Sequence, residues 1–367
     1  MYYILHVATT EDLGGIERFL VNLYSHIDRN RYKFSVICMG KKSPIGDDIA
    51  ALGGKIIYIN KPGHIISYIL DLMTVFSYKK WDIVHFHKNS LANAVPLYLA
   101  MLLSRKSKKI IHSHNTAPKV SSMILNYMHA VNRFIFCSMK WAYLACSDQA
   151  GRWMFGKREF RVVRNGIDIS SFRVEREVRE SVRDRMGISS DRIILGNVAS
   201  FIPQKNHKFL LNVFKAILNK DNRYCLMLLG DGPLQQNFIK EADDMGIGSH
   251  VFFLGVHKDI RPYLYAMDAF VMPSLFEGLP ISAIEAQASG LPLFISDNVD
   301  HDVQISKDVF FIEDLSIPET WRNQIMKYFQ NNRMRNTFEN SSKGNMYDVK
   351  HTAESMMEIY SMLLNDK

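Results

Sequence analysis

The stretch that decides the fold is FVMPSLFEGLPISAIEAQASGLPLFIS, residues 270–296. Its first four residues predict a buried strand, and its last four predict another. Between the strands a loop carries Glu277 and Gly278, a helix begins near Pro280, and Gly290 ends that helix. A strand, a ligand loop, a helix and a second strand in this order form the unit from which nucleotide-binding α/β sheets are built.

Two carboxylates, those of Glu277 and Glu285, lie eight positions apart around the start of this helix. If the helix starts at Pro280, the rise per residue separates them by about 12 Å, too far for a shared proton or metal ion. The spacing suits the two ends of a sugar nucleotide, with free N–H groups near Leu279 and Ile281 facing its diphosphate. The alternative is a first-turn acid stabilised by the helix dipole and a solvated helical glutamate.

Residues around this motif match a known protein family together with it. They are Phe253-Leu254-Gly255, Met267-Asp268-Ala269 and Ala288-Ser289-Gly290-Leu291-Pro292. With them the chain resembles the retaining glycosyltransferases of family four, which have the GT-B fold. It is most similar to the members that build bacterial capsules, exopolysaccharides and O-antigens. The resemblance implies an α/β protein of two Rossmann-like, doubly wound domains that face each other across a cleft. It also implies that Glu277 contacts hydroxyls of the transferred sugar and that Glu285 holds the ribose.

A length of 367 residues suits two domains of about 150 to 200 residues each. We expect an N-terminal, acceptor-side domain over 1–170, a linker over 171–190, a nucleotide-sugar domain over 191–345 and a helix over 346–367 that returns to the first domain. Alternating strands and helices predict a parallel sheet in each domain. The main expected strands are 3–7, 34–39, 55–59, 83–86, 109–113, 192–198, 224–229, 251–254, 270–272 and 293–295.

The composition indicates a cytoplasmic protein. Its four cysteines show neither metal-ligand spacing nor a paired framework, which favours a reducing compartment. The longest nearly apolar run, Leu91–Leu103, which we expect to be a helix, is shorter than the ~20 residues of a spanning helix. No segment is therefore expected to cross a membrane.

Charge is divided unevenly along the chain. Up to Gly187 there are 28 Lys and Arg against 15 Asp and Glu, a net of +13, and the remainder has 17 against 22, a net of −5. The basic half suits peripheral contact with anionic lipid at the inner face of the membrane or an acceptor with a pyrophosphate, and a merely solvated basic surface is the alternative. The apolar stretch Val120–Cys146 suits either a membrane contact or a packed helical pair. Basic and aromatic residues do not interleave as in proteins that stack bases, so nucleic acid is not an expected partner.

A pair of glycines, Gly14 and Gly15, stands where the first strand meets a helix. Such a loop turns backbone N–H groups toward a phosphate, although most glycine pairs are only turns. The resemblance implies that this loop, with Glu17, approaches the diphosphate and sugar of the donor.

Four histidines, His85, His87, His112 and His114, follow two expected strands as His-x-His pairs. They lack an obvious carboxylate or cysteine that would complete a zinc site, and GT-B enzymes generally need no metal to hold the diphosphate. We therefore expect no metal ion and no cofactor. The resemblance implies that His114, with His112 as second choice, lies near the transferred sugar, and a buried histidine without a chemical role is the alternative.

Lys205 stands between a strand and a helix, where a mobile ammonium can neutralise a pyrophosphate leaving group. A lone lysine is usually solvent-facing, and it is the resemblance that assigns this role. The family commonly has an arginine five positions earlier, where this chain has Ser200. Loss of that cation would weaken leaving-group stabilisation unless another residue, such as Arg261, replaces it.

The remaining donor-binding residues complete the set. By the resemblance, Asn165 belongs to a loop that enters the cleft, and Gly255 with Val256 would border the nucleotide base. The loop around the first carboxylate adds Gly278, Leu279, Pro280 and Ile281.

The sequence thus predicts a retaining hexosyltransferase with Glu277, His114 and Lys205 at its catalytic centre. Its expected substrates are a nucleotide-diphosphate sugar, with uridine as the family's usual nucleoside, and a lipid-linked saccharide of a surface polysaccharide. The leaving phosphate can take the acceptor's proton, so no protein base is needed, and catalysis rests on positioning and electrostatics. The alternatives are a non-catalytic partner protein of the same fold and a GT-B sugar-nucleotide epimerase or hydrolase.

Overall fold

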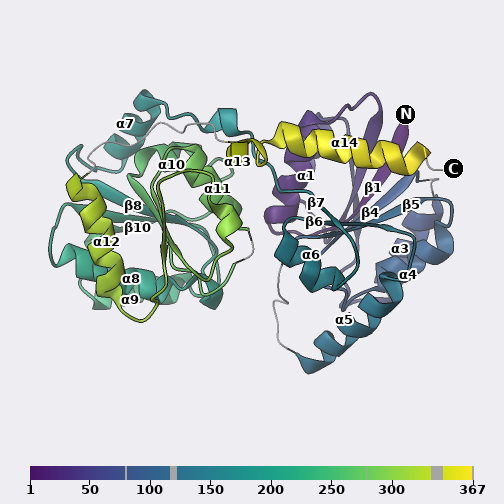
Figure 1. Ribbon diagram of the computed structural model, residues 1–367, viewed down its shortest axis with the longest axis horizontal. Coiled ribbons are helices and arrows are strands. Elements are labelled where there is room, and N and C mark those ends of the chain that lie inside the picture. The colour runs from purple at the N-terminus through teal and green to yellow at the C-terminus, as the bar shows by residue number, and fades with distance from the viewer. Residues whose placement is uncertain (79–80, 116–121, 278, 332–341, 366–367) are drawn as a thin grey trace. The chain divides into compact units, whose positions relative to one another are not determined.

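The computed structural model describes residues 1–78, 81–115, 122–277, 279–331 and 342–365. The chain divides into two compact units, coloured along the chain in Figure 1. Unit 1 comprises Met1–Asp168 with Met346–Lys367, and unit 2 comprises Ile169–Asn345. Residues 171–190, the expected linker, therefore form part of unit 2.

Unit 1 is built on a seven-stranded parallel sheet with the order β3-β2-β1-β4-β5-β6-β7. This is the order of a doubly wound nucleotide-binding sheet, whose direction of winding reverses between β1 and β4. The strands are β1 (Tyr2–Thr9), β2 (Tyr32–Met39), β3 (Lys55–Ile59), β4 (Ile83–Lys88), β5 (Lys108–Ser113), β6 (Ala142–Ala145) and β7 (Arg161–Val162).

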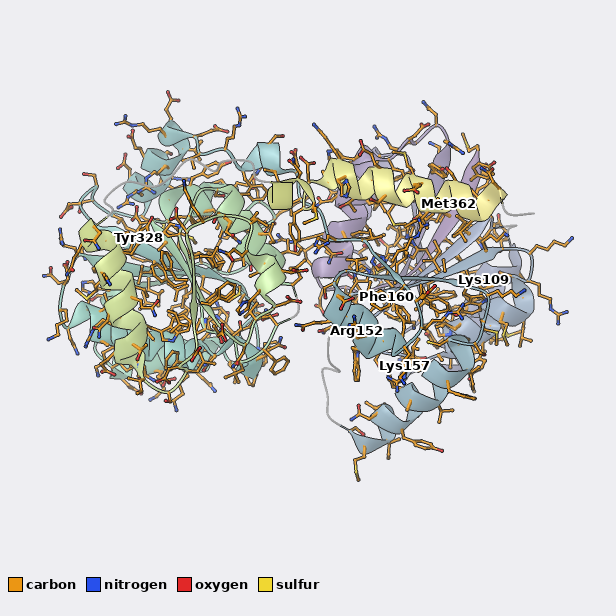
Figure 2. The ribbon with its side chains drawn as sticks, viewed as in Figure 1. Lys109, Arg152, Lys157, Phe160, Tyr328 and Met362 are labelled. Atoms are coloured by element: carbon orange, nitrogen blue, oxygen red, sulfur yellow. The ribbon has the colours of Figure 1, made fainter. Side chains whose placement is uncertain are left out.

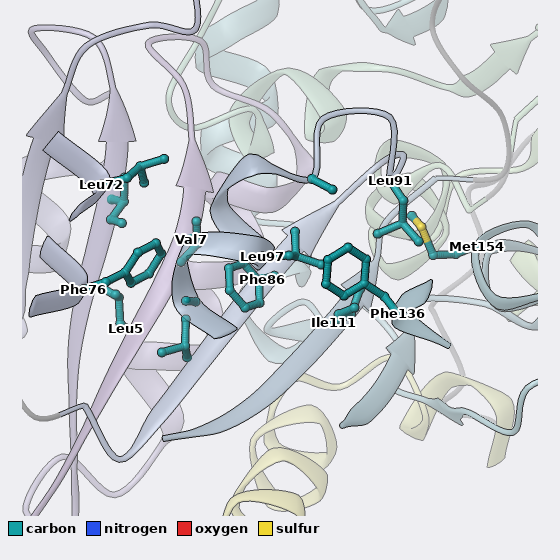
Figure 3. Packing of buried hydrophobic residues seen from close by; sticks show 14 of the residues in the cluster. Leu5, Val7, Leu72, Phe76, Phe86, Leu91, Leu97, Ile111, Phe136 and Met154 are labelled. Carbon is teal, nitrogen blue, oxygen red and sulfur yellow. The ribbon is translucent and has the colours of Figure 1, made fainter. Parts of the chain in front are cut away.

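Helices cover both faces of this sheet, because parallel strands need crossover connections. One buried cluster joins the sheet to α3 (Ile65–Tyr78), α4 (Val95–Leu103), α5 (Met123–Phe136) and α6 (Asp148–Phe155), as Figure 3 shows for Phe76, Phe86 and Phe136. A second cluster joins it to α1 (Gly15–His26), α2 (Gly46–Ala51) and α14 (Val349–Asn365). Lys109, labelled in Figure 2, donates to the carbonyl of Ser104 at 2.5 Å, just after the end of α4.

The last helix, α14, belongs to unit 1 and lies beside α1 (Figure 1). Its Tyr360 is fully buried, and the Tyr360 hydroxyl lies 3.0 Å from Nδ1 of His85 on β4. Gly166 permits close approach here, since a Cβ at that position would lie 2.4 Å from Oγ1 of Thr352. Residues from both ends of the chain thus form one core.

Unit 2 repeats the plan with a six-stranded parallel sheet of order β10-β9-β8-β11-β12-β13. The direction of winding reverses between β8 and β11, which is the expected ligand position in such a sheet. Its strands are β8 (Ile193–Val198), β9 (Tyr224–Leu229), β10 (Val251–Phe253), β11 (Ala269–Met272), β12 (Leu293–Ser296) and β13 (Val309–Ile312).

One face of the second sheet packs on three amphipathic helices, α8 (His207–Leu218), α9 (Gln235–Asp244) and α12 (Pro318–Asn331). Trp321 of α12 is fully buried in this cluster, and Tyr328, labelled in Figure 2, stands on the same helix. The other elements are α7 (Arg176–Arg185), α10 (Arg261–Ala266), α11 (Ile281–Ala288), α13 (Ser342–Asn345) and the single turns η1 (Ile169–Phe172), η2 (Pro203–Lys205), η3 (Gly248–His250) and η4 (His301–Val303).

An ion-pair network holds α7 to the body of unit 2. Arg179 and Arg183 both bind Asp268, at 2.5 Å and 3.2 Å, and Arg179 also donates to the carbonyls of Tyr265 and Met267. Arg183 is 4% exposed, so its charge depends on these partners. This network explains why the charged stretch expected as a linker is part of the unit.

Three local expectations are corrected by the structure. The helix predicted to start at Leu91 starts at Val95, because Pro96 favours the first turn of a helix. Pro280 precedes α11 as its N-cap instead of lying within the helix, so the estimate of 12 Å does not apply. The described part of Val120–Cys146 forms α5 and then β6, so the helical pair is wrong.

Candidate active site

The reversal point of the second sheet carries two loops that are tied to each other. One follows β8 and contains η2, and the other follows β11 and runs to α11. Leu275 N donates to the Gln204 carbonyl at 2.9 Å, and Gln204 Nε2 donates to the Phe276 carbonyl at 3.0 Å. These bonds bring residues about 70 positions apart in sequence to one place.

Lys205 and Glu277 form an ion pair at this junction, with Nζ of the lysine donating to Oε1 of the glutamate. Their side chains are only 19% and 10% exposed. Both residues were predicted from the sequence, but as contacts to different groups of the ligand. The pairing fixes the carboxylate and the ammonium in one place before any ligand binds, which is electrostatic preorganisation.

The second carboxylate of the motif, Glu285, lies in α11 and is 6% exposed. Leu279 and Ile281 are half-buried and Pro280 is buried, whereas Gly278 lies outside the described residues. The first amides of α11 have no carbonyl partner within the helix, as at any helix start.

The turn after β10 offers backbone that a flat ligand can approach. Gly255 has φ of +72°, and a Cβ built there would meet no atom within 4 Å. Val256 is 63% exposed. The Gly255 carbonyl accepts from Gly230 N at 2.8 Å, which ties this turn to the end of β9.

Ser200, at the place of the family's arginine, is exposed. Arg261 is occupied by Asp259, with Nη2 to Oδ2 at 2.7 Å on the surface of the unit. That pairing gives no support to Arg261 as the replacement cation.

In unit 1 the glycine loop after β1 is ordered by Glu17 of α1. Its Oε1 accepts from Thr10 N at 3.0 Å and its Oε2 accepts from Gly14 N at 3.1 Å. Burial raises the pKa of this carboxyl, and the bond from Thr10 N opposes the rise. Glu17 thus shapes the loop from within, whereas Gly15 borders open space, since a Cβ there would meet no atom within 4 Å.

Histidines gather on one face of the first sheet, at β1, β4, β5 and the residue after β5. We call the five rings the histidine cluster, and it consists of His6, His85, His87, His112 and His114. Four are at most 2% exposed, and His114 is half-buried. Burial lowers the pKa of His6 and of His114 to about 3, so the rings are neutral at pH 7.

Within the cluster, two groups of three nitrogens lie close enough to hold a metal ion, His6 with His85 and His87, and His87 with His112 and His114. All of their side chains are neutral imidazoles, without a carboxylate or thiolate in either group.

Asn165 lies near the end of the first run of unit 1 and is 7% exposed. Its neighbour Arg164 is held by α14, since the Arg164 carbonyl accepts from Oγ1 of Thr352 at 3.0 Å. Within the described residues, Oδ1 of Asn165 has no hydrogen-bond partner.

Sequence reasoning missed Lys88 and Ser274, which end or follow strands beside the predicted residues. Lys88 Nζ donates to the Asn93 carbonyl at 3.0 Å, and burial lowers its pKa to about 8. Ser274 follows β11, is 1% exposed, and its hydroxyl has no partner among the residues that the structure describes. Their position at strand ends was the available signal.

Unit 1 thus contains one set of predicted residues and unit 2 another. The first set contains Gly14, Gly15, Glu17, His114 and Asn165, and the second contains Ser200, Lys205, Gly255, Val256, Glu277, Leu279, Pro280, Ile281 and Glu285.

Two family models match the chain along these two sets. The model described as Glycosyltransferase Family 4 matches residues 13–171, and the model described as Glycosyl transferases group 1 matches residues 178–344. The chain belongs to the family 4 glycosyltransferases. The resemblance stated from the motifs is confirmed.

Curated relatives of this glycosyltransferase match it over nearly its whole length. The putative glycosyltransferase EpsF of Bacillus subtilis is 29% identical over 98% of this chain and 96% of that protein. An Escherichia coli protein named UDP-Gal:alpha-D-GlcNAc-diphosphoundecaprenol alpha-1,3-galactosyltransferase is 24% identical over 88% of this chain and 87% of that protein.

The fold is shared with solved structures. HepE from Anabaena, crystallised in complex with UDP-glucose, aligns with a TM-score of 0.79 over 99% of this chain and 100% of that chain, at 17% identity. The predicted GT-B class of two Rossmann-like domains is confirmed. Among the described helices of this glycosyltransferase, none is both long and apolar enough to span a lipid bilayer.

Proposed function

We propose that the protein transfers a hexose, with retention of anomeric configuration, from a UDP-sugar to a lipid-linked saccharide during surface polysaccharide synthesis. The observation that carries the proposal is the Lys205–Glu277 ion pair at the reversal point of the second sheet. Support comes from the UDP-glucose complex of HepE and from the name of the E. coli relative, which states a UDP-galactose donor and a diphosphoundecaprenol acceptor.

In the proposed reaction each side chain has one task. Glu277 orients hydroxyls of the transferred sugar, and Lys205 neutralises charge on the departing diphosphate. The ion pair links the two roles, because the Glu277 carboxylate positions the Lys205 ammonium that contacts the phosphate. Glu285 holds the ribose, and the backbone of Gly255 and Val256 borders the base.

For the residues of unit 1 we propose the roles that the resemblance implies. The loop of Gly14 and Gly15, held open by Glu17, faces the diphosphate with its backbone N–H groups. His114 and Asn165 lie beside the sugar. The acceptor hydroxyl attacks on the face that the diphosphate leaves, and a phosphate oxygen takes its proton, so no protein base and no metal ion are required.

The test is transfer of radiolabelled hexose from a panel of UDP-sugars to lipid-linked saccharides extracted from bacterial membranes. We expect an α-linked product from one donor, seen by the anomeric coupling in NMR. Lys205→Met and Glu277→Gln should each lower turnover by about 10²- to 10³-fold, whereas Lys240→Met, on an exposed helical lysine, should not. Unchanged turnover in both site variants would contradict the roles assigned to Lys205 and Glu277.

Two other outcomes identify the alternatives. Conversion of the donor without any acceptor would favour an epimerase or hydrolase. Absence of calorimetric binding to any nucleoside diphosphate would favour a non-catalytic partner.

We further propose that α5 brings the enzyme to its lipid-linked acceptor by lying on an anionic membrane. This helix differs from an ordinary surface helix, because two of its polar residues, His129 and Asn132, point inward. His129 Nδ1 accepts from Leu91 N at 3.1 Å, and Asn132 Nδ2 donates to the Leu91 carbonyl at 2.8 Å. Both polar side chains are under 10% exposed.

The outward face of α5 is apolar. Its most exposed residues are Met123 at 87%, Ile124 at 72%, Tyr127 at 72% and Phe134 at 84%. A contiguous apolar helix face of this kind marks an interaction site, and a basic flank favours anionic lipid as the partner. The chain up to Gly187 has a net charge of +13, which accords with an anionic partner.

Liposome flotation tests this placement. Moving each of Ile124, Tyr127 and Phe134 halfway into the interface contributes about 1 kcal/mol, so replacing all three by serine should lower the partition coefficient roughly 100-fold. The matched control is Ile317→Ser in unit 2, where the side chain is 48% exposed. If the wild-type protein stays in the bottom fraction with neutral and anionic vesicles alike, at low and high salt, the membrane proposal fails.

A further inference from the structure

The histidine cluster contains a chain of hydrogen bonds that leads from His6 in the core of unit 1 to His114 after β5. His6 Nδ1 lies 2.9 Å from His87 Nε2, and His87 Nδ1 lies 2.8 Å from His114 Nε2. Strand register creates this chain, because His6 pairs with His85 on β4 and two residues further His87 points to the same face. His114 follows β5, where its backbone N–H donates to the Lys88 carbonyl at 3.0 Å.

A neutral imidazole carries one N–H and one lone pair, so the protons in such a chain must all point the same way. In one arrangement His6 donates to His87, which donates to His114, and His114 Nδ1 is left with a hydrogen. In the other arrangement the direction reverses and His6 Nε2 carries the hydrogen. The direction decides what the last ring offers to its neighbour.

The surroundings of the two ends favour the first arrangement. His6 Nε2 is buried without a partner among the described residues, and a buried orphan N–H is rarer than an orphan acceptor. At the other end, His114 Nδ1 and Asn165 Oδ1 are both buried, and neither atom has a hydrogen-bond partner in the described part of the chain. Burial lowers the pKa of His114, and the Asn165 side chain opposes part of that lowering. A hydrogen-bond acceptor that faces Nδ1 would have this effect.

A metal ion explains the cluster less well. Two nitrogens bound to one zinc ion at 2.0–2.1 Å lie about 3.3 Å apart at the tetrahedral angle, whereas the two contacts here are 2.9 Å and 2.8 Å. A divalent charge would also be buried without a compensating carboxylate in either group of three.

We propose that His6 and His87 are positioning residues that hold His114 in its Nδ1–H tautomer, so that His114 donates to Asn165 Oδ1 and the Asn165 amide nitrogen faces away. The amide then offers N–H groups to oxygen atoms of the ligand. This inference rests on the proposed sugar transfer only for its effect on activity. The tautomers are a property of the free enzyme.

The direct test is long-range nitrogen–proton NMR of the full chain labelled with ¹⁵N-histidine at pH 7.5, which distinguishes Nδ1–H from Nε2–H. In water the Nε2–H form is the more common tautomer of a free imidazole, so the proposal predicts the unusual form for all three rings. Signals are assigned with the variants His6→Phe, His6→Asn and His114→Gln. Nε2–H signals for His114, or one bound metal ion per chain by elemental analysis, would overturn the proposal.

Function gives a second readout with a built-in rescue. His6→Phe removes the first donor and should let His114 change tautomer, with at least a tenfold loss in kcat/KM. His6→Asn places an amide N–H near the former Nδ1 and should restore both the Nδ1–H signal and most of the activity. Equal activity in the two variants, with both folded by thermal unfolding, would contradict the positioning role. If the wild-type protein has the predicted tautomers but transfers no sugar, the inference about the histidine hydrogen bonds holds and the proposed function fails.

Discussion

Replacing Lys205 by methionine removes the cation from a carboxylate that is 10% exposed. Exposed ion pairs contribute about 0.2–1 kcal/mol, whereas breaking a buried pair costs about 3–5 kcal/mol. The pair lies nearer the buried limit, so we expect a loss of about 2–3 kcal/mol in the free energy of unfolding of unit 2. For a domain of this size that corresponds to a fall of roughly 5–10 °C in Tm.

A double-mutant cycle measures the coupling between the two side chains. Lys205→Met, Glu277→Gln and the double variant are compared with the wild type by urea denaturation, and the same proteins are assayed for turnover. The double variant should be little worse than the worse single variant, with a coupling of about 2 kcal/mol. Lys240 and Asp244 provide the matched control, since that pair is 77% and 63% exposed and should show no measurable coupling.

The reasoning is refuted if the two single losses add within about 0.5 kcal/mol, because independent sites behave in that way. Such a result would mean that the pair is not formed in solution. Preorganisation by Glu277 would then no longer explain how Lys205 is held.

Four further predictions concern other parts of the molecule. Asp268→Asn leaves the buried charge of Arg183 poorly compensated and should destabilise unit 2 by about 3 kcal/mol in urea denaturation, and a loss below about 1 kcal/mol would contradict the network. Gly15→Ala should leave Tm unchanged, since a Cβ there meets no atom within 4 Å, but should weaken UDP binding at least tenfold by calorimetry; unchanged binding would remove the loop from the site. Ser200→Arg adds a cation at an exposed position and should raise kcat at least tenfold, whereas an unchanged kcat would mean that the cation is not missed. Burial lowers the pKa of the buried histidines His6, His85, His87 and His112 below the value in the unfolded chain, so the free energy of unfolding is full above about pH 6.5 and falls as the pH drops below it. These four rings predict a slope of roughly 5 kcal/mol per pH unit in that range, and a slope under about 1.4 kcal/mol per pH unit would contradict their burial.

The sheets could be predicted from the sequence because strands of a parallel sheet are buried on both faces and appear as short apolar runs. β9 (Tyr224–Leu229) and β3 (Lys55–Ile59) coincide with the predicted ranges. The site loops could be located as well, since they follow those strands. The start of α11 could not, because a proline is compatible with both the N-cap and the first turn.

Long-range pairings were beyond sequence reasoning. The Lys205–Glu277 pair joins positions 72 apart, and the link between His6 and His87 depends on the register of β1 and β4. The orientation of α5 was hidden for another reason. Its apolar residues recur at helical spacing, which usually marks the buried face, whereas the structure buries His129 and Asn132 together with Phe136 and leaves most of the apolar residues exposed.

The position of α14 has a consequence for biosynthesis. Ribosomes add about 5–20 residues per second, so the segment that fills the core beside Phe34 and Tyr32 emerges roughly 10 to 40 seconds after residue 168. Unit 2 is synthesised entirely within that interval and can fold first. The nascent first domain meanwhile exposes the apolar surface that Tyr360 and Met356 will cover, which makes it a substrate for chaperones during translation.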